Sequence, residues 1–178
     1  SGPKGILSAP LMDIRKALLA EHSRSQTMKV VGYIGGDPVR FAELMRLYLG
    51  DDRLAAQRAA WALSYCVELH PGLFRPFAAK IIERLGRKDA HPAVRRNAAR
   101  LLQFVDIPPR HKARAFDACL GLVDDPREPI AVRAFAMTVA ARIADGHPEL
   151  VSELRLIVSK HLKDSTMAFC VRARSILA

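Results

Sequence analysis

Apolar residues recur at helical spacing along almost the whole chain, and residues 89–102 show the pattern best. Within this segment Val94, Ala98, Leu101 and Leu102 occupy positions i, i+4, i+7 and i+8, which lie on one face of an α-helix. The same pattern occurs before and after this segment, and no strand-like alternation accompanies it. The chain is therefore predicted to be all-α.

Helix-start and helix-stop signals place several further helices. Asp37 is suited to cap a helix, and Pro38 then occupies the first turn, where its missing N–H costs nothing. The predicted apolar face of that helix is Phe41, Leu44, Met45 and Tyr48. Before it the pattern predicts helices over residues 11–22 and 26–34, separated by a Ser-Arg-Ser break, and after it a helix over residues 54–69.

Three markers then recur with a period of about 40 residues. The first is a proline at a helix boundary, at Pro71, Pro109 and Pro148. The second comes 23 positions later and is a valine followed by arginine, at Val94-Arg95, Val132-Arg133 and Val171-Arg172. The third is a small residue three positions after each arginine, at Ala98, Ala136 and Ser175. Two helices per period without strands indicate an α-solenoid, in which stacked helix pairs share one core.

The spacing of Asp89, Val94 and Arg95 is similar to the Asp-x4-Val-Arg signature of HEAT repeats. The resemblance covers residues 37–177, with a degenerate helix pair before them. Only this unit carries the full signature, because Asp51 is followed by Gln57, Arg127 and Thr166 replace the aspartate in the last two units, and the usual proline of the first helix is absent.

The resemblance predicts an α-α superhelix of about five antiparallel helix pairs that form a single domain over residues 12–178. Residues 1–11 are expected to be a flexible lead-in or a cloning remnant. The resemblance also implies that Arg95, Arg133 and Arg172 pair with turn aspartates such as Asp51 and Asp89, which ties neighbouring loops together. A ligand-binding ladder of these arginines is the alternative.

The net charge of +10 is distributed unevenly along the chain. Between residues 87 and 114 eight basic residues face only two acidic ones, whereas from residue 116 onward eight basic and eight acidic residues cancel. No apolar run approaches the ~18 residues of a membrane span. The three cysteines are widely separated in apolar helical segments, which predicts reduced core thiols in a cytoplasmic protein.

The basic excess suggests a binding surface on the predicted helix after residue 92. Arg96, Arg100 and Gln103 occupy i, i+4 and i+7, on the face away from Val94 and Ala98. Basic residues in the flanking turns could join them in one patch: Arg87, Lys88, Arg110, Lys112 and Arg114. Such a patch suits a nucleic-acid backbone or an acidic protein segment, and it is equally compatible with a solvated face.

Trp61 and Tyr65 lie one helical turn apart and could stack on a base beside such a patch. DNA-alkylation-repair proteins built from HEAT-like repeats use a basic concave face with aromatic residues, and the chain resembles them only in architecture and charge. The alternative is that Trp61 fills a gap between the first two repeat layers.

No catalytic, cofactor or metal site is predicted. The histidines lack metal-ligand spacing, and the pairs Asp51-Asp52 and Asp124-Asp125 are expected to cap helices. The first hypothesis is a non-enzymatic module that binds an acidic protein or peptide on its concave, basic surface. The second is nucleic-acid binding, with or without a base-repair activity like that of the alkylation-repair group, and the third is a subunit whose open end is buried by another copy.

Overall fold

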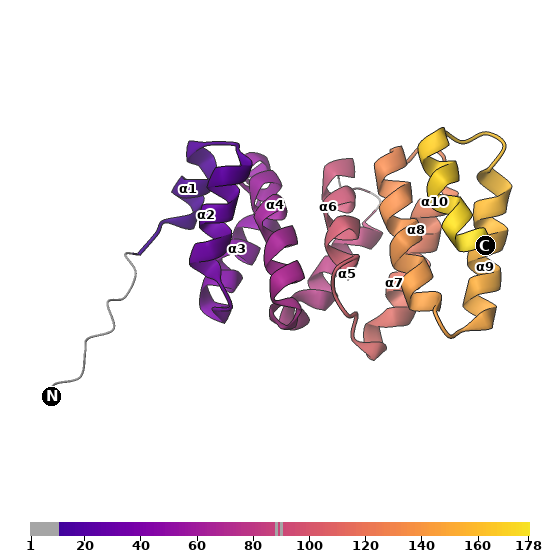
Figure 1. The fold of residues 1–178 in the computed structure, drawn as a ribbon, viewed down its shortest axis with the longest axis horizontal. Helices are drawn as coiled ribbons and strands as arrows, with labels where there is room; N and C mark the ends of the chain where they lie inside the picture. Colours follow the sequence, from indigo (N-terminus) through magenta and orange to yellow (C-terminus); the bar gives the residue numbers. More distant parts are fainter. Residues whose placement is uncertain (1–10, 88, 90) are drawn as a thin grey trace, which may run out of the picture. The chain divides into compact units, whose positions relative to one another are not determined.

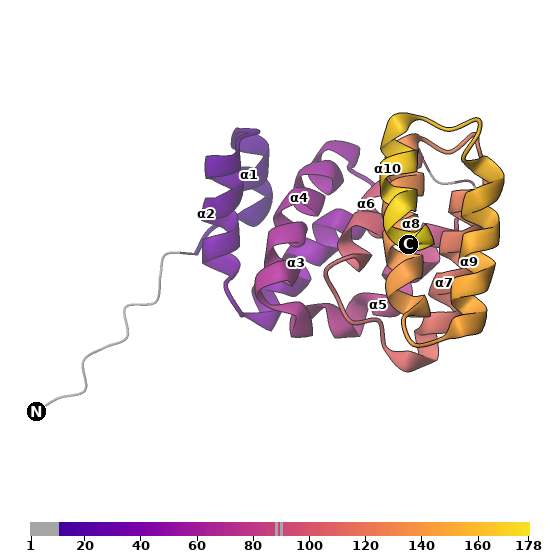
Figure 2. The same ribbon diagram turned by 45° about the vertical axis from the view of Figure 1, so that its right-hand side comes forward.

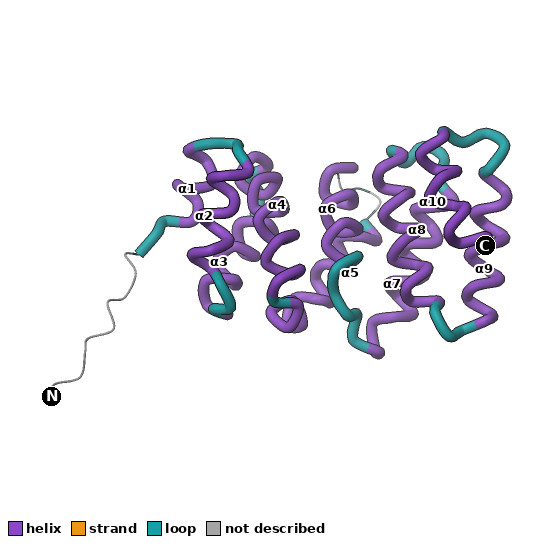
Figure 3. Tube along the Cα trace, in the orientation of Figure 1, coloured by secondary structure: helices purple, strands orange, loops and turns teal. Residues whose placement is uncertain are grey.

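The structure is a computed structural model that describes residues 11–87, 89 and 91–178. The described residues form ten α-helices and one short 3-10 helix and contain no strand, which confirms the all-α fold class (Figures 1 and 3). The elements are α1 (Ile14–Ala20), α2 (Arg24–Ile34), α3 (Pro38–Leu49), α4 (Arg53–Leu69), η1 (Pro71–Phe77), α5 (Ala78–Gly86), α6 (Pro92–Leu102), α7 (Pro109–Asp124), α8 (Ile130–Ala144), α9 (Pro148–His161) and α10 (Met167–Leu177).

The helices form two compact units. The first unit extends to Ala62 and the second runs from Leu63 to Ala178, so that α4 contributes to both. The prediction of a single domain over residues 12–178 stays a prediction. The predicted lead-in falls almost entirely on residues 1–10, which lie outside the described residues.

In unit 1, α1 packs against α2 and α3 (Figure 2). The buried side chains include Ile14, Val30, Ile34, Phe41 and Leu44, of which Phe41 and Leu44 belong to the predicted apolar face of α3. Burying side chains of this size contributes about 1.5–3 kcal/mol each, which holds short helices that would be marginal alone.

Polar residues cap these helices as their sequence signals predict. The Ser23 hydroxyl accepts a hydrogen bond from the Gln26 N–H, and the Asp37 carboxylate accepts from the N–H groups of Val39 and Arg40. Each cap satisfies backbone donors that the first helical turn leaves without an intrahelical partner.

Unit 2 has two layers of helices. The first helix of each pair, α5, α7 and α9, contacts the first helix of the next pair, and the second helices α6, α8 and α10 contact one another in the same way. The shared core between the layers includes Ile81, Phe116, Val132, Met137 and Phe169. Cys66 and Cys119 are also buried, and burial raises the pKa of the Cys66 thiol to about 12. These thiols are therefore protonated and inert at neutral pH.

The structure moves one predicted helix boundary and shows a 3-10 helix after the boundary predicted at Pro71. The first helix begins at Ile14 rather than residue 11, because Asp13 caps it, and Leu11 is 97% exposed. After Pro71 the chain forms the 3-10 helix η1, which contains Pro76. Proline lacks the N–H that an α-helical turn would need from this position, and α5 starts only after it.

The repeat register also fails in α10. Val132 and Ala136 are fully buried in α8, as predicted, but the corresponding Val171 is 56% exposed and Ser175 is also exposed. The core-facing residues of α10 are Phe169 and Ala173. Because two residues correspond to a rotation of about 200° around a helix, this shift turns the predicted face outward.

Candidate interaction surface

Helix α6 carries the centre of the predicted binding surface. His91 precedes its first residue, Pro92, and the His91 imidazole Nδ1 accepts a hydrogen bond from the Ala93 N–H at 3.2 Å. The inner face buries Ala98 and Leu101 together with other apolar residues, whereas Val94 is only half-buried. This burial orients α6 and leaves the opposite face to solvent.

The predicted residues Arg96, Arg100 and Gln103 lie on the outer side of α6. Arg96 is exposed and Arg100 is half-buried, and neither guanidinium has a hydrogen bond or ion pair with any described residue. The Gln103 side-chain N–H donates to the Arg100 carbonyl oxygen at 3.4 Å, so Gln103 helps to end the helix. The side chains of these two arginines therefore take no part in the polar contacts among the described residues.

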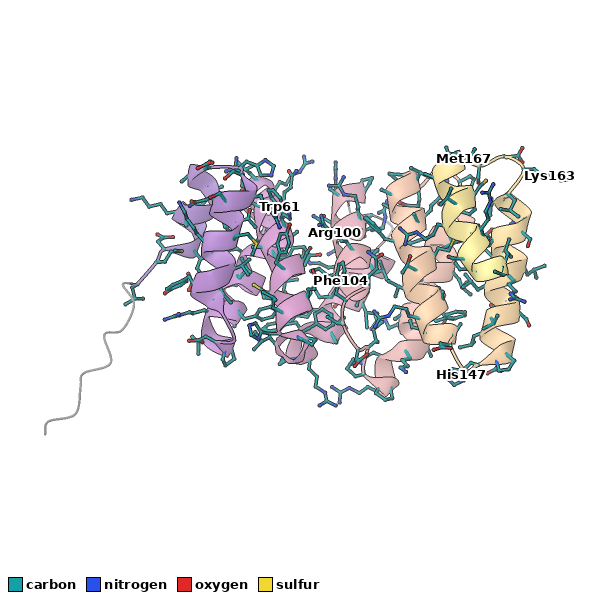
Figure 4. All side chains as sticks on the ribbon, in the orientation of Figure 1. Trp61, Arg100, Phe104, His147, Lys163 and Met167 are labelled. Atoms are coloured by element: carbon teal, nitrogen blue, oxygen red, sulfur yellow. The ribbon has the colours of Figure 1, made fainter. Side chains whose placement is uncertain are left out.

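Phe104 adds an apolar side chain to this surface that the sequence reasoning missed. It follows Arg100 by four positions and is 40% exposed (Figure 4). Phe104 was overlooked because it lies two residues beyond the last helical residue, Leu102.

The flanking basic residues lie on different elements from Arg96 and Arg100. Arg110 and Arg114 lie one turn apart on the exposed side of α7, which belongs to the other helix layer of unit 2. Lys112 borders a small hollow of about 50 Å³ beside Asp106. The loop after α6 leads into α7 and so places Arg110 and Arg114 in the other layer, whereas Lys112 shares its hollow with Leu102 of α6, and the convergence stays a prediction.

Arg87 has a different role from the one predicted. Its guanidinium forms an ion pair with Asp89 at 2.7 Å, which raises the pKa of Arg87 and lowers the pKa of Asp89. Both side chains are exposed, so the pair contributes little stability. Lys88, the remaining member of the predicted patch, lies outside the described residues.

The repeat arginines Arg95, Arg133 and Arg172 were expected to pair with turn aspartates. They do bond to groups of the fold, but the partners that the structure shows are other groups. Arg95 forms an ion pair with Glu128 at 2.8 Å, and the side chains of this pair are only 9% and 11% exposed. Since Glu128 lies in the turn before α8, Arg95 ties its own repeat to the next turn through a glutamate. Arg95 also donates to the Arg87 carbonyl oxygen at 3.1 Å.

The next two repeat arginines bind neutral groups. Arg133 donates twice to the Val123 carbonyl oxygen, at 3.0 and 2.8 Å, and its guanidinium lies 4.5 Å from the centre of the Phe169 ring. Arg172 donates to the Thr138 hydroxyl at 3.0 Å. Asp51 is exposed, and its neighbour Asp52 caps α4 instead by accepting from the Leu54 and Ala55 N–H groups.

Several other arginines satisfy carbonyl groups at helix C-termini, a role that the sequence reasoning did not assign. Arg58 in α4 donates to the carbonyl oxygens of Leu18 and Leu19, and Arg142 in α8 donates to those of Leu102 and Gln103. The last turn of a helix leaves such carbonyls without intrahelical donors. The arginine richness of the chain is therefore partly structural.

The aromatic pair of α4 is divided between the two units. Trp61 is half-buried in unit 1, where its ring meets His22 edge-on with 5.4 Å between ring centres (Figure 4). Tyr65 is half-buried and belongs to unit 2. The described contacts of Trp61 are thus local to unit 1, and its proposed stacking on a base stays a prediction.

The paired carboxylates have structural partners. Asp125 accepts from the Arg127 N–H and forms an ion pair with its guanidinium, while Asp124 accepts from Lys160 at 2.8 Å and His161 at 2.7 Å. The Lys160 and His161 hydrogen bonds lower the pKa of Asp124. The described residues contain no group of three or more acidic, histidine and cysteine side chains placed to hold a metal ion.

The comparison with known families agrees with this helical architecture. The HEAT repeat domain model matches residues 14–178, which is nearly the whole chain. The chain belongs to the HEAT repeat family. The match confirms the suspected family and shows that the degenerate N-terminal helices are part of the HEAT domain. HEAT repeats generally form protein-interaction modules, which fits the coarse function predicted from the sequence.

The comparison with curated proteins found no match for this HEAT-repeat chain. Among the described helices, none is both long enough and apolar enough to cross a membrane.

Proposed function

We propose that this HEAT-repeat chain is a non-enzymatic module that binds an acidic protein segment on the outer side of α6. Arg96 and Arg100 would contact carboxylates of the partner, and Phe104 would contact an apolar side chain beside them. This proposal concerns the layer of second helices, which was expected from the sequence to line a concave surface.

The proposal rests on a difference in bonding between two sets of arginines in unit 2. The first set is Arg96 and Arg100, and the second is most of the other arginines. Arg95, Arg133 and Arg142 bind carboxylates or carbonyl groups of the fold, whereas Arg96 and Arg100 make no such bond to a described residue. Arginine forks bind carboxylates with paired hydrogen bonds, and an adjacent aromatic side chain adds apolar contact.

A protein partner is favoured over nucleic acid by the number of basic residues on this side. Nucleic-acid binding proteins commonly neutralise about 6–10 phosphates. Among the described residues, Arg96 and Arg100 are the available cations of α6 itself, Lys112 lies near its C-terminal end, Arg87 is paired, and the exposed Arg110 and Arg114 lie in the other layer. Nucleic acid remains the second candidate on account of the charge excess between residues 87 and 114.

Fluorescence anisotropy can test the proposal with two labelled probes: a peptide with glutamates spaced four residues apart among leucines, and a random-sequence DNA duplex. The double variant Arg96→Ala plus Arg100→Ala should weaken peptide binding at least about tenfold, equivalent to about 1.4 kcal/mol. The matched control is Arg110→Ala plus Arg114→Ala, which removes the same charge from α7 and should leave peptide affinity nearly unchanged.

Two outcomes would contradict the proposal. Equal losses in the two double variants would show that binding depends on total charge rather than on the α6 surface. Duplex binding without peptide binding would favour the second candidate, and two phosphate contacts would then give a log–log salt slope of about −2.

A further inference from the structure

A second candidate site lies in unit 2 between the helices of the last repeats. It is an open hollow of about 400 Å³ whose lining residues come from α8, α9 and α10 and include Asp145, the C-cap residue of α8. None of them belongs to α6. Ligand pockets have volumes of about 300–1,000 Å³, so the hollow has room for a small chemical group.

Arg172 supplies a positioned positive charge at this hollow. Its Nη1 donates to the Thr138 hydroxyl at 3.0 Å, and that hydroxyl donates in turn to the Ala134 carbonyl oxygen at 3.2 Å. These two hydrogen bonds fix the orientation of the Arg172 guanidinium. Among the described residues no carboxylate forms an ion pair with Arg172, although the side chain is half-buried.

Arg95 matches Arg172 in the sequence repeat, although α10 packs in a different register. Arg95 shows what a shielded guanidinium of this chain binds, because it forms an ion pair with the carboxylate of Glu128. A partly desolvated guanidinium gains from a carboxylate partner that it can bind through paired hydrogen bonds. Arg172 has the same chemistry and faces a hollow in place of a glutamate.

The other lining residues restrict the ligand further. Val151, Leu154 and Ile176 give the hollow an apolar wall. Arg142 and Asp145 carry opposite charges at its border, so that together with Arg172 they leave one net positive charge. A single carboxylate with an aliphatic group fits this balance better than a doubly charged phosphate.

We propose that this hollow binds an aliphatic carboxylate, with the carboxylate on the Arg172 guanidinium and the aliphatic group against Val151, Leu154 and Ile176. Two sources share this chemistry: a free branched-chain fatty acid, and the C-terminal residue of a peptide that ends in leucine. The site is independent of the α6 surface, since it uses different helices and a different arginine.

The test is an NMR titration of the full chain with two probes, 4-methylpentanoate and a short peptide ending in leucine with a free C-terminus. At least one probe should produce saturable shifts at residues lining the hollow, with a Kd of about 1 mM or tighter. Amidation of the peptide should abolish its binding, because the carboxylate is then absent. The responding probe identifies the source of the carboxylate.

Variants separate the proposed contact from general charge effects. Arg172→Met should weaken binding at least about tenfold, and Arg172→Lys should retain part of it because the charge remains. The matched control is Arg174→Met, which removes an exposed charge from α10 outside the hollow and should change affinity less than about twofold.

Three results would overturn the proposal: no saturable shift with either probe, equal binding of the amidated peptide, or equal losses in Arg172→Met and Arg174→Met. If Arg172→Met does not fold, Arg172→Lys decides in its place, and unchanged affinity in that variant would also overturn it. The double variant of Arg96 and Arg100 should leave this binding intact, which separates the proposal from that for α6.

Discussion

The inner and outer arginines of unit 2 have the same side chain but opposite surroundings. Arg95 and Arg133 are 7% and 5% exposed and bind a carboxylate and a carbonyl oxygen of the fold. Arg96 and Arg100 lie on the outer side of α6, where they make no such bonds to the described residues. Arg95 and Arg96 are thus adjacent in the sequence, yet the fold uses the first and leaves the second available to a partner.

Burial explains the difference. A buried guanidinium must have partners in the fold, because an unpaired charge away from water is strongly unfavourable. An exposed guanidinium is solvated and can exchange water for a partner's carboxylate at small cost. The comparison predicts large stability effects for the inner arginines and their partners, and binding effects with little loss of stability for the outer ones.

The largest expected effect is on the partner of Arg95. Glu128→Ala removes the carboxylate from a nearly buried ion pair, so the free energy of unfolding should fall by about 3 kcal/mol. Urea unfolding followed by circular dichroism measures this change. Arg96→Ala is the control on the same helix and should change stability by less than about 0.5 kcal/mol. Similar values for the two variants would remove the distinction between inner and outer residues.

An intermediate effect is expected for the second inner arginine. Arg133→Met keeps an apolar stem but takes two hydrogen bonds from the Val123 carbonyl oxygen and the cation from the face of Phe169. The expected loss is about 2 kcal/mol, since a buried carbonyl group loses its partner. Thermal unfolding can measure it, with Arg114→Met on the exposed side of α7 as control. An unchanged melting temperature for Arg133→Met would contradict this role.

The smallest effect concerns Asp124. Burial lowers the pKa of Arg133, and the charge of Asp124 offsets part of that lowering. Hydrogen bonds from Lys160 and His161 hold the pKa of Asp124 below its ordinary value of 3.8. Asp124 therefore stabilises the folded chain above that ordinary value, and this contribution is lost as pH falls through the lowered pKa. Because the carboxylate is 39% exposed, the contribution should stay below about 1 kcal/mol.

Comparison with Asp124→Asn isolates this contribution. The difference in unfolding free energy between the two proteins should be present at pH 6, should shrink as the pH falls below the ordinary value of 3.8, and should vanish once the pH lies below the lowered pKa of the folded state. A difference that does not change between these pH values would show that the ionised carboxylate is not its source.

The helices were largely predictable, because apolar spacing and capping residues are local signals. Asp37 with Pro38 marks the start of α3 in both sequence and structure. The outward position of Val171 was not predictable from the repeat, since its valine–arginine pair looks the same as that of α8. Only the packing of α10 through Phe169 and Ala173 shows that the register differs.

The candidate surface was predictable only in part. Helical spacing correctly separates Arg96 and Arg100 from the buried face of α6. Spacing along the chain could not show that Arg110 and Arg114 lie in the other layer, nor that Arg58 and Arg142 bind carbonyl groups about 40 residues earlier. Those contacts depend on how helices stack, which local periodicity does not describe.

Residue spacing is enough to establish that this chain is helical, that its helices recur with a HEAT-like period, and which face of most helices is apolar. These properties follow from side-chain spacing within single helices. Which arginines the fold uses depends on packing between helices, because the partners of Arg95, Arg133 and Arg142 lie on other elements. Packing also decides that Arg172 faces a hollow rather than a carboxylate, since this depends on the register in which α10 packs against α8 and α9.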